Sequence, residues 1–167
     1  MKVKEIEVGR FYHDNKAGVR EVLAIIEEAD GNTNVYFRIL AAKAAQEYDS
    51  DRREMVSVLG TTSHCLVSSF STWAKVGMDE LGARALMTSM QAKKIKLPPG
   101  ELAFMVSALD EVGGPLAEGL RVEIAHTEGR AVSGLEKKGL LQRDRATDEA
   151  VFTSLGAAWS VVYRLHH

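Results

Sequence analysis

Two adjacent prolines, Pro98 and Pro99, separate two parts of the chain that have different hydrophobic patterns. Proline disfavours helical geometry in the residue that precedes it, so a helix is expected to end before this pair. The first part of the chain falls into short apolar runs typical of strands, whereas the residues after Pro99 follow helical spacing. The sequence therefore predicts an α+β protein with a first domain at 1–78, a linking helix at 79–97 and a second domain at 98–167.

The first part predicts short antiparallel strands. The expected strands are Val3–Tyr12, Val19–Glu28, Asn34–Ala42, Met55–Leu59 and His64–Val67. Turn signals such as Asp30-Gly31-Asn32 separate the early ones, and the polar residues 41–53 predict a loop. So many short strands in so short a segment favour a small closed barrel, because closure removes exposed strand edges.

This part is expected to end in a short helix, because Phe70, Trp73 and Ala74 have the spacing of one helical face. These side chains would plug one end of the barrel. Together with the opening residues Val8–Tyr12, the pattern of strands and aromatic residues resembles the small SH3-like barrels of phage and mobile-element proteins. The resemblance implies a fold and carries no catalytic signature.

The link and the second domain are expected to be mainly helical. Asp79 can cap the linking helix, and Gly113 can end the helix that begins at Pro99. A short helix is expected from Pro115 and another from Thr127, as its cap, to Gly139. The remaining expected elements are strands at Leu140–Asp144 and Glu149–Thr153 and a last helix from Thr153 or Ser154 to about Leu165.

The run from Thr127 to Leu141, which contains Leu135-Glu136-Lys137-Lys138-Gly139-Leu140, resembles the third helix of bacterial winged-helix regulators of the MarR type. Phe152-Thr153-Ser154-Leu155-Gly156 is similar to the end of the wing in that family. The resemblance covers roughly residues 98–156. It implies a winged helix-turn-helix domain that contacts duplex DNA.

The outward face of this helix carries Arg130, Ser133 and Lys137, and the equivalent face of helix-turn-helix proteins enters the major groove. Five basic residues between 130 and 145 stand against two acidic ones, a local charge of +3. The residues expected to contact DNA are Thr127, Arg130, Ser133, Lys137, Lys138, Arg143 and Arg145. Arg130 and Ser133 are predicted at base edges, and Lys137, Arg143 and Arg145 at phosphates.

The sequence leaves two functions open. The first is a non-enzymatic DNA-binding regulator, encoded by a phage or mobile element, in which the barrel adds a second contact surface. The second is an adaptor or inhibitor that binds a protein such as host machinery. A net charge of −2, with Glu123 and Glu128 close to the third helix, favours the second function, whereas the local +3 favours the first.

Two further surfaces have alternative interpretations. The apolar last helix, with Trp159 and Tyr163, would form a homodimer or pack on the linking helix. The basic residues of the first domain would line a nucleic-acid groove beside Phe11 and Tyr12, or form an ordinary solvated surface. These residues are Arg10, Lys16, Arg20, Arg38, Arg52 and Arg53.

Several classes of protein are not expected. No run of residues is apolar enough to span a bilayer and no secretory signal begins the chain, so the cytoplasm is the expected location. The single cysteine, Cys65, excludes an internal disulfide and is expected in the core. The histidines, including the terminal His166 and His167, have no metal spacing, and no catalytic motif is found. We therefore expect no enzymatic activity and no cofactor.

Overall fold

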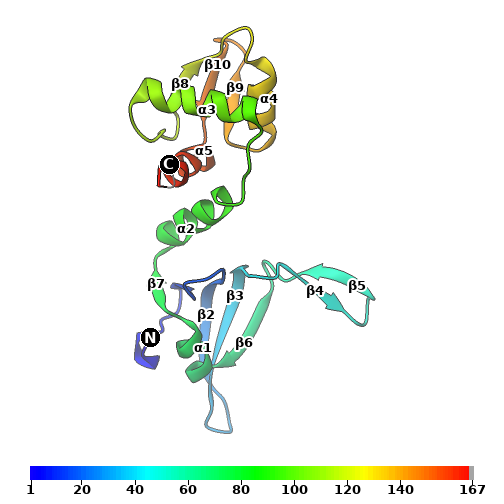
Figure 1. The fold of residues 1–167 in the computed structure, drawn as a ribbon. Coiled ribbons are helices and arrows are strands. Elements are labelled where there is room, and N and C mark those ends of the chain that lie inside the picture. The colour runs from blue at the N-terminus through cyan, green and yellow to red at the C-terminus, as the bar shows by residue number, and fades with distance from the viewer. Residues whose placement is uncertain (166–167) are drawn as a thin grey trace. The chain divides into compact units, whose positions relative to one another are not determined.

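The computed structural model describes residues 1–165 and has an α+β fold, with five α-helices and antiparallel sheets in that range (Figure 1). The chain divides into two compact units, residues 1–87 and 88–167. The boundary falls inside helix α2 (Glu80–Ala92). Each unit has a hydrophobic core of its own.

The first unit is built on a five-stranded antiparallel sheet in the order β6-β3-β2-β1-β7. Its strands are β1 (Phe11–His13), β2 (Val19–Glu27), β3 (Thr33–Ala41), β6 (Thr62–Leu66) and β7 (Val76–Met78). In the described part of the chain, β6 pairs only with β3 and β7 only with β1. A barrel needs every strand to have two hydrogen-bonded neighbours, so the expected closed barrel is not found among these residues.

The first expected strand, Val3–Tyr12, is mostly absent. In its place the structure has a short 3-10 helix, η1 (Val3–Glu5), and only β1 at the end of the segment is a strand. The Tyr12 hydroxyl donates a hydrogen bond to the Glu5 carbonyl at 3.0 Å and accepts one from the Glu7 N–H at 2.8 Å. These bonds fold the segment back on itself, which an extended strand could not do.

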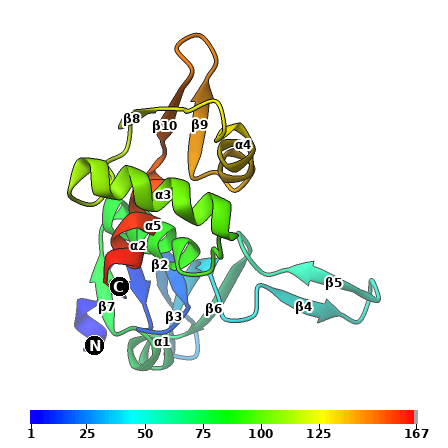
Figure 2. The same ribbon diagram turned by 45° about the horizontal axis from the view of Figure 1, so that its top comes forward.

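A second difference lies at residues 41–53, which were expected to form a loop. They contain β4 (Gln46–Asp49), which pairs with β5 (Glu54–Ser57) as a separate hairpin. This hairpin extends away from the five-stranded sheet (Figures 1 and 2). Strand β4 has no alternation of apolar residues, so the sequence predicts no strand there, whereas β5 overlaps the strand expected at Met55–Leu59.

Helix α1 (Val67–Trp73) covers one face of this sheet. Phe70 and Ala74 are fully buried, as their helical spacing predicts. The Phe70 ring packs edge-on against Tyr12, with 5.6 Å between ring centroids. The core cluster consists of Ile6, Tyr12, Val22, Val35, Phe37, Phe70 and Ala74, and Cys65 packs against it.

The second unit alternates helices with a three-stranded antiparallel sheet in the order β8-β10-β9. Its elements are α3 (Pro99–Val112), β8 (Arg121–Glu123), α4 (Gly129–Lys137), β9 (Leu141–Asp144), β10 (Glu149–Phe152) and α5 (Ser154–Arg164). Strands β9 and β10 form a hairpin directly after α4 (Figure 2).

Three expected helix ends are confirmed. The Asp79 carboxylate accepts the Gly82 N–H at 2.8 Å at the start of α2. Gly113 ends α3 in the left-handed conformation, with φ of 67°. The Thr153 hydroxyl accepts the Gly156 N–H at 3.2 Å and so caps α5.

The short helix expected from Pro115 is wrong, because this segment bonds to other elements instead of to itself. The Leu116 N–H donates to the buried Ser160 hydroxyl at 2.9 Å. The Gly119 N–H donates to the Phe152 carbonyl at 2.8 Å, and β8 then pairs with β10. Hydrogen bonds to other elements therefore outweigh the preference for a helix that Pro115 gives.

The last helix packs within its own unit. Trp159 stacks on Tyr163 with 5.0 Å between ring centroids, and both belong to the cluster that includes Ala92 and Ile95 at the end of the expected linking helix. Part of its apolar surface is therefore covered without a second copy of the chain. Leu165 is 76% exposed, and dimerisation through this helix stays a prediction.

Candidate nucleic-acid interface

The buried side of α4 determines which of its side chains face outward. Val132 and Leu135 have no exposed surface, and Leu140 seals the end of the helix. Gly139, with φ of 73°, ends the helix as expected, and the Leu140 N–H returns to the Leu135 carbonyl at 3.1 Å. The opposite side of α4 is therefore the outward face.

The start of α4 differs from the expectation that Thr127 caps it. The helix begins at Gly129, the residue before it is Glu128, and no side chain there caps the helix. The Glu128 carboxylate instead accepts the Ala125 N–H at 2.8 Å, which closes the preceding turn. Thr127 lies exposed in that turn and is not a cap.

Arg130, Ser133 and Lys137 are exposed on the outward side of α4 and line one groove with Thr127. The Ser133 hydroxyl donates to the Gly129 carbonyl at 2.8 Å, so it is partly satisfied within the helix. Arg130 and Lys137 have no hydrogen bond or ion pair with any described residue. They lie two helical turns apart, roughly 10 Å along the axis.

Lys138 is not available in the same way. Its ammonium lies 2.8 Å from Oε1 and 2.7 Å from Oε2 of Glu101, a carboxylate on α3 whose residue is 9% exposed. This ion pair crosses α4 at Gly134, where a Cβ atom would lie 2.2 Å from Glu101 Oε1. Glycine is therefore needed at position 134 so that the Glu101 carboxylate can approach α4. This packing role explains why α4 contains a glycine although glycine weakens a helix.

The two arginines of the hairpin also differ from each other. Arg143 is half-buried and its guanidinium forms an ion pair with Asp148, with Nε 3.1 Å from Oδ1. Arg145 is exposed in the turn between β9 and β10 and makes no such pair within the described residues. Arg145 is thus the hairpin cation that is free to meet a ligand.

A third arginine, Arg121 on β8, holds the carboxylates at the base of the hairpin. Its guanidinium lies 3.0 Å from Asp144 and 2.7 Å from Glu149. The hydrogen bond from Arg121 lowers the pKa of Asp144 below its usual range. The Thr147 hydroxyl, and then Arg121, lower the pKa of Glu149.

These ion pairs reduce the positive charge expected for this surface. Lys138 and Arg143 are neutralised by Glu101 and Asp148, both outside the range 130–145, and including them lowers the local charge from +3 to +1. Neither acidic partner was found from the sequence. Glu101 lies 37 positions before Lys138, so no spacing rule connects the two residues.

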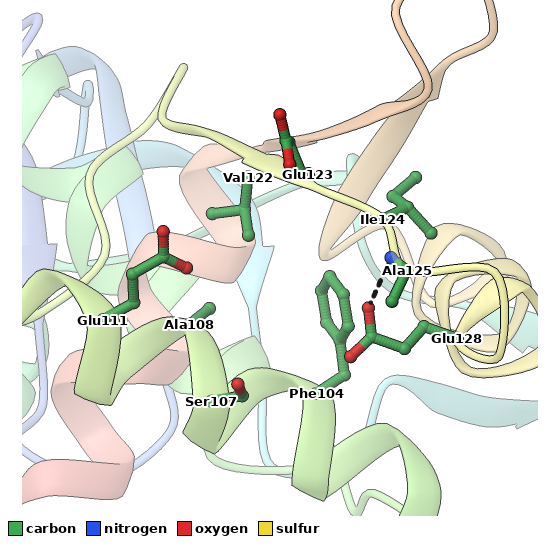
Figure 3. Close-up of a pocket in the computed structure, with 9 residues that line it drawn as sticks. All are labelled: Phe104, Ser107, Ala108, Glu111, Val122, Glu123, Ile124, Ala125 and Glu128. Atoms are coloured by element: carbon green, nitrogen blue, oxygen red, sulfur yellow. Dashed lines mark hydrogen bonds between the residues drawn. The ribbon is translucent and has the colours of Figure 1, made fainter.

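Two grooves lie beside α3. The first, of about 910 Å³, runs between α3 and α4 and includes the outward residues of α4. The second, of about 340 Å³, lies between α3 and the segment from Val122 to Glu128. Figure 3 shows the Phe104 ring and Ala108 on α3 opposite Val122 on the strand. Phe104, Ser107 and Glu128 line both grooves, so the two are continuous.

The basic residues of the first unit do not form one free surface. The Arg20 guanidinium lies between the rings of Phe37 and Trp73, 4.3 and 4.0 Å from their centroids, and burial lowers its pKa. Arg38 pairs with Glu21 at 3.2 Å. Tyr12 is 1% exposed, so it cannot stack on a base in a groove.

Among residues 1–165 no three His, Cys, Asp or Glu side chains are placed to hold a metal ion. No helix in the same range is long and apolar enough to cross a membrane. Cys65 is partly buried, and burial raises the pKa of its thiol, which disfavours the reactive thiolate.

Comparison of the chain with models of protein families, with curated proteins and with solved structures gave no significant match.

Proposed function

We propose that the second unit is a winged-helix domain that binds duplex DNA, with α4 in the major groove and the β9–β10 hairpin against the backbone. One observation carries this proposal. Arg130, Lys137 and Arg145 are exposed on α4 and on the hairpin that follows it, and none has an acidic partner among the described residues. Cations left without a partner on a helix and an adjoining hairpin suit the phosphates that flank a groove.

The three free cations have different proposed roles. Arg130 lies in the first turn of α4, the part of a recognition helix that reads base edges. Lys137 at the end of α4 and Arg145 in the hairpin turn would meet phosphates. Lys138 and Arg143 are assigned to support, because each already has a carboxylate partner.

The supporting helix is α3 in this proposal. A helix-turn-helix has a helix just before the recognition helix, whereas residues 113–128 contain none here. Helix α3 takes that place through the Glu101–Lys138 ion pair over Gly134. The first unit is proposed as an accessory module of the same regulator.

The test is a salt-titrated binding assay of the full chain on random and genomic duplexes. Lys137→Ala is expected to weaken binding to all duplexes. It should also lower the salt slope, which is the steepness with which the logarithm of the binding constant falls with the logarithm of salt concentration, by about one unit. Arg130→Ala should cost about 1–3 kcal/mol on the preferred site and less on random DNA. Lys43→Ala, which removes an exposed cation from the first unit, is the matched control and should change neither.

A wild-type protein that binds no duplex more tightly than about 10⁻⁴ M at physiological salt would contradict this proposal. So would Lys137→Ala and Lys43→Ala variants with equal salt slopes.

A second function is proposed because a separate observation favours it. The groove between α3 and β8 has carboxylates along its rim, from Glu111, Glu123 and Glu128, and no cation lines it. Such a surface repels phosphates. It supports a second function for the same unit, that of a protein-binding adaptor or inhibitor. This function is an alternative or an addition to DNA binding.

A further inference from the structure

Residues 93–97, the lysine turn, connect the end of α2 to the start of α3 and carry a charge that the interface described above does not include. Lys93, Lys94 and Lys96 are all exposed. None of the three side chains makes an ion pair or a hydrogen bond with a residue that the structure describes. Residues 88–100 contain these three lysines and no Asp or Glu. The lysine turn is therefore a positive surface that its neighbours in sequence do not neutralise.

The backbone of the lysine turn is held on the second unit. The Lys93 N–H donates to the Ser89 carbonyl at 3.1 Å, which extends α2 into the turn. Ile95 and Leu97 pack against the hydrophobic core of the second unit. The turn is therefore anchored by its apolar residues, and its lysines stand in solvent at a fixed place beside α3.

The lysine turn lies next to the groove between α3 and α4. Pro98 lines this groove together with Arg130 and Lys137. Lys96 is two residues before Pro98, so the Cα atoms of the two residues are at most about 7 Å apart. The Glu101–Lys138 ion pair brings the start of α3 to the end of α4. Lys137 is therefore the unpaired cation of α4 that lies nearest to the lysine turn.

The surface between Lys137 and the lysine turn is open. Gly100 is exposed and lines the groove, and a Cβ atom built on it would have no other atom within 4 Å. Two carboxylates also line the groove. Glu101 is neutralised by Lys138, and Glu128 lies at the other end of α4, where it accepts the Ala125 N–H. No side chain or unneutralised carboxylate therefore separates the two sets of cations.

The arrangement of these cations indicates the kind of anion that they fit. They come from two elements and are spaced along one surface, whereas a small anion would meet only one or two of them. A nucleic-acid backbone presents phosphates at regular intervals, and lysines that contact phosphates position a duplex without reading its sequence.

We propose that the lysine turn is a second phosphate-contact surface for the duplex that α4 binds. The backbone of one DNA strand passes from Lys137 over Gly100 to Lys96 and Lys94. This inference rests on the DNA-binding function proposed above and extends its interface beyond α4 and the hairpin. The turn contributes affinity without regard to sequence, and it fixes the orientation of α4 on the duplex.

The experiment measures the salt slope of the full chain on random and genomic duplexes. Lys94→Gln/Lys96→Gln is expected to weaken binding to all duplexes alike and to lower the slope by about two units, since each phosphate contact contributes about 0.9. Adding Lys137→Ala should lower it by about one unit more, because one duplex covers both sets of cations. The control is Lys4→Gln/Lys43→Gln, which removes two exposed cations from the first unit and should change neither affinity nor slope.

A second pair of variants tests the path over the start of α3. Gly100→Glu places a carboxylate between the two sets of cations, and Gly100→Gln has nearly the same size without the charge. Gly100→Glu should bind duplexes roughly tenfold more weakly than Gly100→Gln, because its charge faces phosphates. Both variants should melt at or above the wild-type temperature, since Gly100 is exposed in the first turn of α3 and glycine is a poor helix former.

The outcomes separate this inference from the function on which it rests. A salt slope for Lys94→Gln/Lys96→Gln equal to that of Lys4→Gln/Lys43→Gln would overturn the inference. If Lys137→Ala still lowered the slope, the DNA-binding function would stand without the lysine turn. Equal affinities of the two Gly100 variants would show that no strand passes over the start of α3. A wild-type protein that binds no duplex would remove the function and the inference together.

Discussion

The α4–hairpin surface and the α3–β8 groove belong to one small unit, yet they have opposite charge. Arg130, Lys137 and Arg145 stand free on the first, whereas Glu111 and Glu123 stand free on the second. The net charge of −2 conceals this separation. The kind of partner that a surface binds is therefore indicated by which of its charges lack an internal partner, and less by how many charges the sequence holds.

The ion pair between Glu101 and Lys138 lies where α3 crosses α4. It removes one cation from the basic surface and one carboxylate from the acidic helix. The close approach depends on Gly134, because any side chain would displace the Glu101 carboxylate. One pair of residues therefore both holds the helices together and limits the charge of each surface.

Leu135→Asp should do the most damage, because unfolding of the second unit removes both surfaces together. Leu135 has no exposed surface and belongs to the cluster that contains Phe104 and Leu140. An unpaired charge there costs several kcal/mol, comparable with the total stability of about 5–15 kcal/mol. Circular dichroism should show loss of helix, while Ser133→Asp on the exposed side should melt near the wild-type temperature. A native melt for Leu135→Asp would mean that the phase of α4 is misassigned.

The next effect tests the crossing point. Glu101→Gln removes the charge partner of Lys138, and since the lysine side chain is 33% exposed the cost should be only about 1 kcal/mol. The freed ammonium should raise the salt slope for duplex binding by up to about one unit. Urea unfolding and salt-titrated binding measure the two effects, with Asp110→Asn on the same helix as control. Unchanged stability and slope would show that this pair does not limit the basic surface.

The elements that carry these surfaces were predictable where local signals agree with the fold. Gly113, Gly139 and Thr153 end or begin helices as expected, and the β9–β10 hairpin lies within one residue of its predicted limits. These positions depend on backbone conformation or capping, which nearby residues determine.

The failures share a different cause. The segment after Pro115 became a strand partner of β10 because bonds to Phe152 and Ser160 replaced those of a helix. Closure of the first sheet depends on pairing between distant edges, which periodicity does not encode. The availability of Lys138 depends on Glu101, a contact across 37 positions. Long-range partners, more than element types, limited the prediction of the site.

A smaller effect distinguishes the two hairpin arginines. Arg145→Ala should lower the salt slope for duplex binding by about one unit, because Arg145 has no internal partner. Arg143→Ala should lower it less, since Asp148 already neutralises that guanidinium. Stability of either variant should stay within about 0.5 kcal/mol of the wild type, as for most surface changes. Equal slopes for the two variants would mean that the Arg143–Asp148 pair opens on binding.

The smallest effect concerns Arg121, the one cation in residues 99–128. Arg121 on β8 holds Asp144 and Glu149, and it helps to keep the pKa of both carboxyls below the usual range. A carboxyl with a lowered pKa in the folded state stabilises the fold above its unfolded pKa, and this contribution is lost as pH falls through the folded pKa. Arg121→Ala should therefore raise both pKa values toward normal, seen by NMR titration, and should weaken the acid-side dependence of stability. Arg130→Ala, which removes a cation without these partners, should shift neither pKa. If Arg121→Ala leaves the pKa of both carboxyls unchanged, Arg121 does not bind them tightly and is free to neutralise the acidic groove. The difference in charge between the two surfaces would then be smaller than the ion pairs indicate.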